Sequence, residues 1–330
     1  MIIKGLVSIV TPCYNGEKLI HRLLDSVLRQ DYPQIEMIVV DDGSKDQTRS
    51  VVEGYVETFE NKGYTLKYVY QDNAGQAAAI NKALPLVKGE YLIWPDADDF
   101  FLVDNSISIM VYTLESLDES YATVRCWENF IDENTSEVIS ENHFNPSKEQ
   151  LFEEYFTGKE TVAVTGTHMV RMECFDKVNP MRHIYDKRQP QNFQMLLPLN
   201  YSYKIHTICQ TLFGRLIRIN SHSRCEESYE KHIDDAQGYK EIMDHTFASI
   251  AAMTPEDRDR CLRLSAIYSL SGKLYYSLKY GRVREARSYA KEMRELEVPE
   301  TTAGKIRLVL VSCPPLLKLF DKIVDRLRKL

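Results

Sequence analysis

The chain has 330 residues, of which 44% are hydrophobic and 27% charged, values typical of a soluble globular protein with one large domain or two smaller ones. The net charge of −7 argues against a protein that binds nucleic acid by bulk attraction, although residues 301–330 carry a local +5. The seven cysteines are scattered without a Cys-x-x-Cys pair, which favours reduced thiols over a disulfide framework or a zinc site.

The first hundred residues are predicted to alternate between buried strands and amphipathic helices. Asn15 is the expected N-cap of the first helix, and Ser44 with Gln47 forms a capping-box signal before the second. A third helix-like segment begins at Gly75 and weakens at Pro85. This alternation is typical of a parallel, doubly wound sheet. The expected strands cover residues 6–10, 35–40, 64–70 and 91–94.

Polar or acidic segments follow all four expected strands. Because ligands gather at the carboxyl ends of parallel strands, we expect these segments to face one crevice. Neither a Gly-x-Gly-x-x-Gly after the first strand nor a Gly-x-x-x-x-Gly-Lys motif is present, so a Rossmann dehydrogenase and a P-loop enzyme are disfavoured. The four segments are Pro12-Cys13-Tyr14-Asn15, Asp41-Asp42-Gly43-Ser44, Asp72-Asn73-Ala74-Gly75 and Asp96-Ala97-Asp98-Asp99.

The last segment places three carboxylates within four residues, at Asp96, Asp98 and Asp99. Such charges at the end of a buried strand cost free energy unless a cation or hydrogen-bond donors compensate them. Mg²⁺ or Mn²⁺ bridging to a diphosphate would compensate them, because these ions take one or two carboxylates together with phosphate oxygens. An isolated Asp-x-Asp is more often a solvated acidic turn, so the metal prediction depends on the surrounding sequence.

Together these segments resemble the nucleotide-sugar-binding half of family 2 glycosyltransferases. That family has the GT-A fold, an α/β architecture with a Rossmann-like, mostly parallel sheet. The resemblance implies transfer of a sugar, with inversion, from a nucleoside-diphosphate donor such as a UDP-sugar to a hydroxyl of a glycan or glycolipid in cell-surface polysaccharide synthesis. It rests on residues 7–15, 36–48, 73–75, 79–83 and the Asp-x-Asp segment.

The resemblance implies that a first group of residues holds the nucleotide. Pro12 and Tyr14 would wall the base, Tyr14 by stacking on it. Asp42 would accept a hydrogen bond from the base, and Asp41 would support that loop or the ribose. Asn73 would belong to the same donor site. Taken singly, Tyr14 could be a core aromatic and Asn73 a turn residue.

A second group is implied at the diphosphate and the metal. Asp96 and Asp98 would lie near the ribose and diphosphate, and Asp98 or Asp99 would bind Mn²⁺ or Mg²⁺. His222 is a candidate further metal ligand, although a lone histidine is more often a surface residue. Arg224 could neutralise phosphate charge.

The acceptor side departs from the family pattern. The family usually carries Glu-Asp there, one of whose carboxylates acts as general base, whereas Gln191 and Asn192 resemble a subgroup with Gly-Gln-Asn. These amides cannot remove a proton, but they can position a hydroxyl. The base would then be Asp186, Asp98 or Asp99. Alternatively, Gln191 and Asn192 only cap a helix.

Three segments are predicted along the chain. Residues 1–105 would form the nucleotide-sugar-binding half of the GT-A domain, and residues 106–225 the acceptor-binding half. Residues 226–330 are expected to be a helical C-terminal region for packing or self-association. A helix start at Thr254-Pro255 and a stop at Gly281 indicate a helical hairpin there.

The last helix, predicted over 314–330, has an apolar sector opposite a basic face. In an acidic protein this pattern favours peripheral attachment to an anionic membrane surface, although a helix packed on its own domain would show the same stripe. The apolar run 308–317 is too short to span a bilayer, so the expected location is the cytoplasm or the inner face of the plasma membrane.

Two other functions stay open at this point. A nucleotidyltransferase of similar fold would need a basic, Gly-rich phosphate loop after the first strand, and the sequence has none. A non-catalytic binder of glycans or nucleotide sugars is compatible with the missing Glu-Asp.

Overall fold

The computed structural model describes residues 2–157, 165–187, 191–217 and 228–297. The chain divides into two compact units. The first comprises residues 1–224 and 245–253, and the second comprises residues 225–244 and 254–330.

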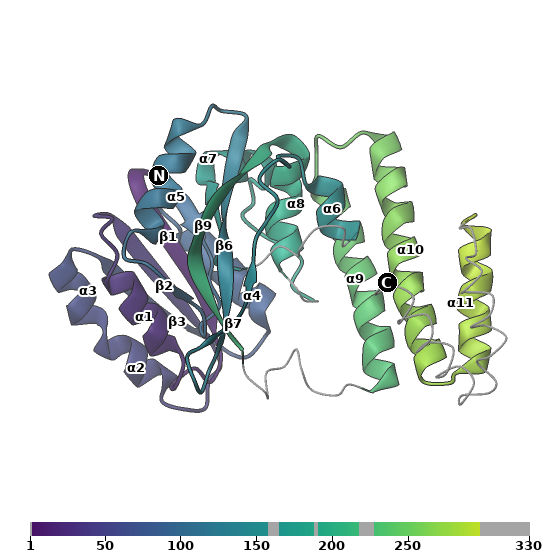
Figure 1. Ribbon diagram of the computed structural model, residues 1–330, viewed down its shortest axis with the longest axis horizontal. Helices are drawn as coiled ribbons and strands as arrows, with labels where there is room; N and C mark the ends of the chain where they lie inside the picture. The colour runs from purple at the N-terminus through teal and green to yellow at the C-terminus, as the bar shows by residue number, and fades with distance from the viewer. Residues whose placement is uncertain (1, 158–164, 188–190, 218–227, 298–330) are drawn as a thin grey trace. The chain divides into compact units, whose positions relative to one another are not determined.

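The described part of the first unit is built on one mixed sheet of nine strands (Figure 1). Strands β3, β2, β1 and β4 pair in parallel in this order and form the predicted doubly wound half. Strand β8 comes next and is antiparallel to both β4 and β6. Strand β9 lies parallel to β6. Strand β5 pairs antiparallel with β9, and β7 pairs antiparallel with β6. The strands are β1 Ile3–Cys13, β2 Ile35–Asp42, β3 Thr65–Gln71, β4 Gly89–Ile93, β5 Phe100–Phe101, β6 Tyr121–Asp132, β7 Val138–Asn142, β8 His168–Arg171 and β9 Lys204–Ile217.

Helices cover both faces of this sheet. Buried side chains of α1, α3 and α5 share a core with alternate residues of β1, β2 and β4, which places these helices on one face. Buried residues of α4, α7 and α8 lie outside that core and pack on the other face. Since both faces of β2 are covered, all eight of its residues are buried. The helices are α1 Ile20–Leu28, α2 Thr48–Gly54, α3 Val56–Lys62, α4 Gln76–Ala83, α5 Ser106–Ser116, α6 Phe152–Thr157, α7 Met172–Val178 and α8 Asn192–Ser202.

The predicted N-cap at Asn15 is wrong, because α1 begins five residues later at Ile20. Asn15 instead adopts a positive φ of 50°, and its Oδ1 accepts a hydrogen bond from the backbone N–H of Lys45 at 2.8 Å. The Asn15 N–H donates in return to Ser44 Oγ at 2.9 Å. These polar side chains therefore connect the loops after β1 and β2 instead of capping helices.

The predicted capping box is also wrong. The second helix begins at Thr48 after Gln47, which makes no side-chain cap, and Asp46 accepts from the Thr48 N–H at 3.0 Å. A break at Tyr55 divides the expected single helix into α2 and α3. The third helix weakens at Pro85 as predicted, because α4 ends at Ala83 and Pro85 lies in the 3₁₀ turn η1, Leu84–Leu86.

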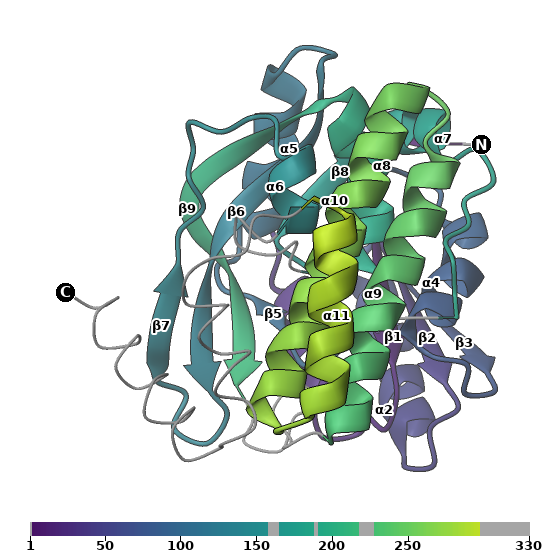
Figure 2. The same cartoon turned by 90° about the vertical axis from the view of Figure 1, so that its right-hand side faces the viewer.

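The second unit contains the predicted helical hairpin. Thr254 caps α10, Pro255–Lys279, by accepting from the Asp257 N–H at 3.1 Å. Gly281, with a φ of 67°, lies between α10 and α11, Val283–Glu295. Figure 2 shows α10 and α11 side by side. Ala286 of α11 is buried in a small apolar cluster with Leu278 of α10. Helix α9, Tyr229–Ser249, precedes them.

Several predictions fall outside the described residues: His222, Arg224 and the helix over 314–330. The division of the GT-A domain at residue 105 stays a prediction. Among the described helices, none combines the length and the apolar character needed to cross a membrane.

Candidate active site

Asp42 connects the ends of β2 and β3. Asp42 is 5% exposed, and its carboxylate accepts hydrogen bonds from Gln71 Nε2 at 2.8 Å, Ala74 N at 2.8 Å and Gly75 N at 2.9 Å. Asn73 Nδ2 donates to the Asp42 carbonyl oxygen at 2.9 Å. A carboxylate offers about four lone-pair positions, so about one is left for the base that the resemblance assigns to Asp42. That contact stays a prediction.

The neighbouring Asp41 holds the same loop from the other side. Its carboxylate accepts from the Ser44 N–H at 2.8 Å and from the Tyr68 hydroxyl at 2.6 Å. Gly43, between the two acidic residues, has a φ of 80°, and a Cβ there would lie 2.6 Å from Asn73 N. Only glycine fits this close approach of the two strand ends.

The segment after β1 presents an aromatic ring at the same edge. Tyr14 leaves 49% of its surface exposed, so the alternative of a core aromatic is wrong, and its ring is accessible for stacking. Cys13 beside it is buried, and burial followed by the charge of Asp41 raises the pKa of its thiol to about 12. A thiol with that pKa is not a nucleophile at neutral pH.

The acidic segment after β4 is tied to two distant parts of the chain. Asp96 accepts from Gln76 Nε2, at the start of α4, at 2.6 Å and from Thr165 Oγ1, before β8, at 2.7 Å. Asp99 is buried and accepts from the Leu216 N–H of β9 at 3.2 Å. Helix α4, the approach to β8, and β9 thus converge on these carboxylates.

Negative charge dominates this convergence. Burial raises the pKa of Asp96, against the hydrogen bond from Thr165, and the charge of Asp98 adds to the rise. Burial and the charges of Asp96 and Asp98 raise the pKa of Asp99 well above its usual value. Arg215 opposes both shifts, but its nearest described carboxylate is the buried Glu128, at 3.6 Å between Nε and Oε2. A further cation would relieve the remaining repulsion.

The chemistry of these oxygens fits Mn²⁺ or Mg²⁺. In the described part of the chain, no three metal-ligating side chains gather around one point. An ion here would therefore take one or two carboxylates from the protein and other oxygens from its substrate, which is the habit of these metals at diphosphates.

The predicted acceptor residues lie at the start of α8. Trp94, directly after β4, donates from Nε1 to Asn192 Oδ1 at 3.1 Å, which connects the helix to the strand that carries the acidic segment. Gln191 is buried at the N-cap, makes no side-chain cap, and its Oε1 accepts no hydrogen bond. The alternative that Gln191 serves only as a helix cap is therefore wrong.

Asp186 lies in a segment that is held between two helices. Asn81 of α4 accepts from the Ile184 N–H and donates to its carbonyl oxygen, both at 2.8 Å. Gln194 of α8 pairs in the same way with Tyr185, at 2.6 and 2.8 Å. The Asp186 side chain is 30% exposed, as a general base for an incoming hydroxyl should be. Its role as base stays a prediction.

Sequence reasoning missed several residues of this site. Gln76 could have been found, because it directly follows the Asn73-Ala74-Gly75 motif. Thr165 opens a segment with family resemblance, but nothing in the sequence pairs it with Asp96. Arg215 gave no signal, since its position follows from the pairing of β9 with β6.

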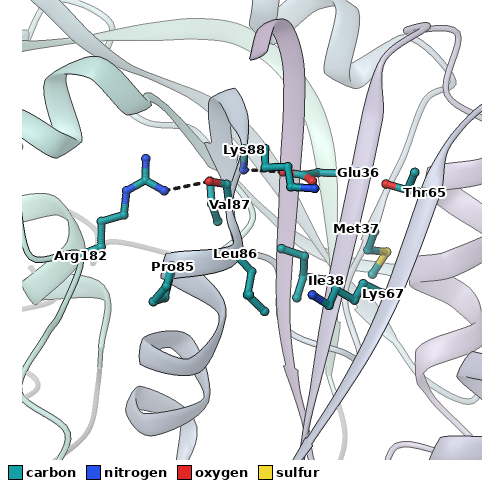
Figure 3. A pocket seen from close by; sticks show the side chains of 10 residues that line it. All are labelled: Glu36, Met37, Ile38, Thr65, Lys67, Pro85, Leu86, Val87, Lys88 and Arg182. Carbon is teal, nitrogen blue, oxygen red and sulfur yellow. Dashed lines mark hydrogen bonds between the residues drawn. The ribbon is translucent and has the colours of Figure 1, made fainter. Parts of the chain in front are cut away.

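A pocket of about 460 Å³ lies elsewhere in the first unit (Figure 3). Glu36 and Thr65 place it at the amino ends of β2 and β3, opposite the acidic segment. Glu36 accepts from the Lys88 N–H at 2.7 Å, and Arg182 donates to the Val87 carbonyl oxygen at 2.8 Å. It is therefore not the candidate active site. Its lining comprises Glu36, Met37, Ile38, Thr65, Lys67, Pro85, Leu86, Val87, Lys88 and Arg182.

Comparison with known proteins decides the family. The model of Glycosyl transferase family 2 matches residues 8–215, which is well over half of the chain. The match runs from within β1 to within β9 and includes every strand between them. The chain belongs to glycosyl transferase family 2. The glycosyltransferase TuaG of Bacillus subtilis, named for teichuronic acid biosynthesis, is 38% identical over 113 residues, which are 34% of this chain and 43% of TuaG. The chain spans about two-fifths or less of the length of its first-matched curated relatives.

Solved structures show the fold. TarS of S. aureus, residues 1–349 in complex with UDP-GlcNAc, is 19% identical with a TM-score of 0.62, covering 96% of this chain and 92% of that one. The mannosyltransferase PcManGT of Pyrobaculum calidifontis, in complex with GDP-Man and Mn²⁺, is 18% identical with a TM-score of 0.56, covering 98% and 84%. The predicted GT-A fold with C-terminal helices is thereby confirmed.

Proposed function

We propose that this family 2 protein transfers a sugar from a UDP-linked donor to a hydroxyl of a glycan or glycolipid, with inversion at the anomeric carbon. The observation that carries the proposal is the joining of the strand-end segments at one edge of the sheet. Asp42 holds the turn at Ala74 and Gly75, while Asp96 binds Gln76 on the helix that follows this turn. A nucleotide site and an acidic diphosphate site are thus parts of one hydrogen-bonded frame.

The donor would lie across this frame. The exposed ring of Tyr14 would stack on the base against Pro12, with Asp42 as acceptor and Asn73 beside it. Asp41 would keep the loop in place through Tyr68. TarS was solved with UDP-GlcNAc and PcManGT with GDP-Man, which supports a nucleotide-sugar donor in this fold.

Mn²⁺ or Mg²⁺ would be held by Asp98 or Asp99, and it would stabilise the charge that develops on the leaving diphosphate. The complex of PcManGT with Mn²⁺ supports this assignment. His222 and Arg224 are the proposed further contacts to metal and phosphate. Asp96, with both oxygens already bonded to Gln76 and Thr165, would orient the segment.

On the acceptor side, Gln191 and Asn192 would orient the hydroxyl and Asp186 would take its proton. Asp99 is a weaker candidate for the base, because it is buried and bonded to Leu216. Asp186 is more exposed and stands next to a segment fixed on α8.

For the whole protein we propose a role in cell-surface polysaccharide synthesis, supported by the name of TuaG. Residues 1–105 would bind the donor and residues 106–225 the acceptor. The basic, amphipathic sequence over 314–330 would attach the protein peripherally to an anionic membrane surface facing the cytoplasm.

A ligand panel tests the function. We expect UDP-sugars to raise the melting temperature more than GDP- or dTDP-sugars, and only with Mn²⁺ or Mg²⁺ present, because a ligand of the folded state stabilises it by mass action. UDP release in the presence of the donor then shows turnover. A melting temperature that no nucleotide sugar raises would contradict the proposed donor site.

The second candidate is a non-catalytic binder of nucleotide sugars or glycans. The amides of Gln191 and Asn192, where the family usually has carboxylates, favour it. Donor binding without UDP release under any acceptor condition would support this candidate.

A further inference from the structure

Arg125, in β6, is the largest charged side chain that the described structure buries completely, with 0% of its surface exposed. Its Nε donates to Thr207 Oγ1 at 2.9 Å and Nη2 to the Asn145 carbonyl oxygen at 3.3 Å, while the Phe144 ring covers the guanidinium at 4.5 Å. Nη1 has no acceptor, and no carboxylate among the described residues forms an ion pair with it. Because an arginine stays ionised in a protein, this is a buried cation without a counter-ion.

Two other arginines of the same unit show how such a group is normally satisfied. Arg171 of β8 donates to three backbone carbonyl oxygens. Arg182 forms two hydrogen bonds to Asp176, at 2.7 and 2.8 Å. It also donates to the carbonyl oxygen of Val87, a bond that Figure 3 shows. Both are less buried than Arg125. The guanidinium with least access to water is thus the one with fewest acceptors.

The sheet register places Arg125 on the same face of the sheet as Trp94, with β8 between their strands. Leu92 of β4 and Thr123 of β6 both pair with Val170 of β8, so the three side chains project from the same face. Arg125 lies two residues further along β6 and projects from that face as well. Trp94, two residues after Leu92 and directly after β4, follows the same alternation. Trp94 binds Asn192 at the start of α8, so Arg125 belongs to the face that this helix covers.

We propose that Arg125 binds an oxyanion, a carboxylate or a phosphate, carried by the acceptor of the transferase. This inference rests on the proposed function and adds a substrate class to it. An isolated buried charge costs free energy, and an oxyanion at Nη1 would supply both the missing acceptor and the missing negative charge. Phe144 covers the guanidinium and must move aside when the anion enters.

The proposal predicts an unusual pair of effects. Replacing Arg125 by methionine, which has a similar length and no charge, should leave the melting temperature equal or higher, because removing the uncompensated charge outweighs the hydrogen bonds lost at Thr207 and Asn145. The same change should remove anion binding. Arg171→Met is the matched control. It removes the donor to three backbone carbonyl oxygens, so this variant should have a lower melting temperature than wild type. Anions should still raise its melting temperature.

The probes are glucuronate and glycerol 3-phosphate, with glucose and glycerol as neutral controls. Binding is followed by thermal shift at constant ionic strength, with UDP and Mn²⁺ present to occupy the donor site. We expect wild type to respond to one or both anions and not to the neutral compounds, with an apparent Kd at least about tenfold weaker in Arg125→Met. A response to glucuronate alone identifies a uronate acceptor, and a response to glycerol 3-phosphate alone identifies a phosphate-containing one.

Three results overturn the proposal: no anion-specific shift in wild type, an unchanged response in Arg125→Met, or early melting of Arg125→Met like that of Arg171→Met. Arg125→Lys, which keeps the charge without the planar fork, should fold and bind anions more weakly than wild type. Full affinity in this variant also contradicts the assignment. If UDP does not raise the melting temperature but the anions still do, the result counts against the proposed function and not against the role of Arg125.

Discussion

The two halves of the GT-A sheet differ in how completely their buried polar groups are satisfied. Within residues 2–105 the structure leaves one buried side-chain polar atom without a hydrogen bond, Thr11 Oγ1, whereas in the described part of 106–217 it leaves eight. These eight belong to Thr123, Arg125, Glu128, Asn129, Gln191, Asn200 and Arg215.

Two of the eight, Glu128 Oε2 and Arg215 Nε, face each other as an ion pair at 3.6 Å. Each of the other six costs about 1–3 kcal/mol of stability, so the difference needs a physical reason. In the proposed donor half, residues 2–105, Asp41, Asp42 and Asp96 already have their partners, which means that the nucleotide would meet a preformed frame. In the proposed acceptor half, partners are missing around Arg125 and Gln191. We interpret the proposed donor half as rigid and the proposed acceptor half as a region that its substrate would complete.

The largest expected effect concerns the acidic segment. Asp98→Asn or Asp99→Asn should lower sugar transfer by about a thousandfold or more and remove metal-dependent donor binding, because the metal and its diphosphate lose a ligand. Circular dichroism should show an intact fold. Full activity in both variants, or activity unchanged by excess EDTA, would break the metal assignment.

Asp186→Asn tests the acceptor half and should lower kcat by about a hundredfold or more while affinities for donor and acceptor stay nearly unchanged, since only proton removal is lost. Asn192→Ala is the companion variant and should raise the acceptor KM far more than it alters UDP binding. Wild-type turnover in Asp186→Asn would move the base to Asp98, Asp99 or another group.

Asp42→Asn tests the rigidity of the donor half. The new amide would turn an N–H group towards the Ala74 or Gly75 N–H, so we expect a loss of about 2–4 kcal/mol in the free energy of unfolding by urea, with weaker UDP binding. Asp104→Asn is the control, because the Asp104 side chain is 69% exposed and pairs with the exposed Arg29, and it should cost less than about 1 kcal/mol. Equal effects in both variants would contradict the preformed frame.

The smallest expected effect depends on pH. Burial raises the pKa of Glu128 above its usual 4.5, with Arg215 and Asn142 opposing the shift. The folded state therefore holds this proton to higher pH than the unfolded chain does, and stability falls as pH rises from 4.5 through the raised value.

Glu128→Gln removes this ionisation and can still accept from Asn142. It should be about 1 kcal/mol more stable than wild type at neutral pH, with the difference vanishing below pH 4.5. Urea midpoints across this range measure it. A constant difference at all pH values would show that Glu128 is not ionised at neutral pH.

The same contrast explains what the sequence could predict. In the proposed donor half, the site residues lie at or shortly after the carboxyl ends of strands. Strand periodicity and the parallel rule therefore place Asp42 and Asp96 at one edge without knowledge of the sheet order. In the acceptor half, Thr165 and Arg215 reach the site only because β8 and β9 pair with β6 across long stretches of chain. No local pattern encodes that pairing.

Local rules also failed where tertiary contacts competed with them. Asn15 and Ser44 have side chains that can cap helices. In the fold, however, they accept hydrogen bonds from backbone N–H groups of the loops after β1 and β2, those of Lys45 and Asn15. Short polar side chains bond whichever donor the fold brings near.

The turn held by Asp42 has a consequence for hydrogen exchange. The amides of Ala74 and Gly75 lie in a loop, where exchange with water is ordinarily fast, yet both are bonded to a buried carboxylate. They can exchange only when Asp42 separates from the turn, an opening that also disturbs the end of β2. These loop amides should therefore be protected to nearly the same degree as the central strands, with or without nucleotide.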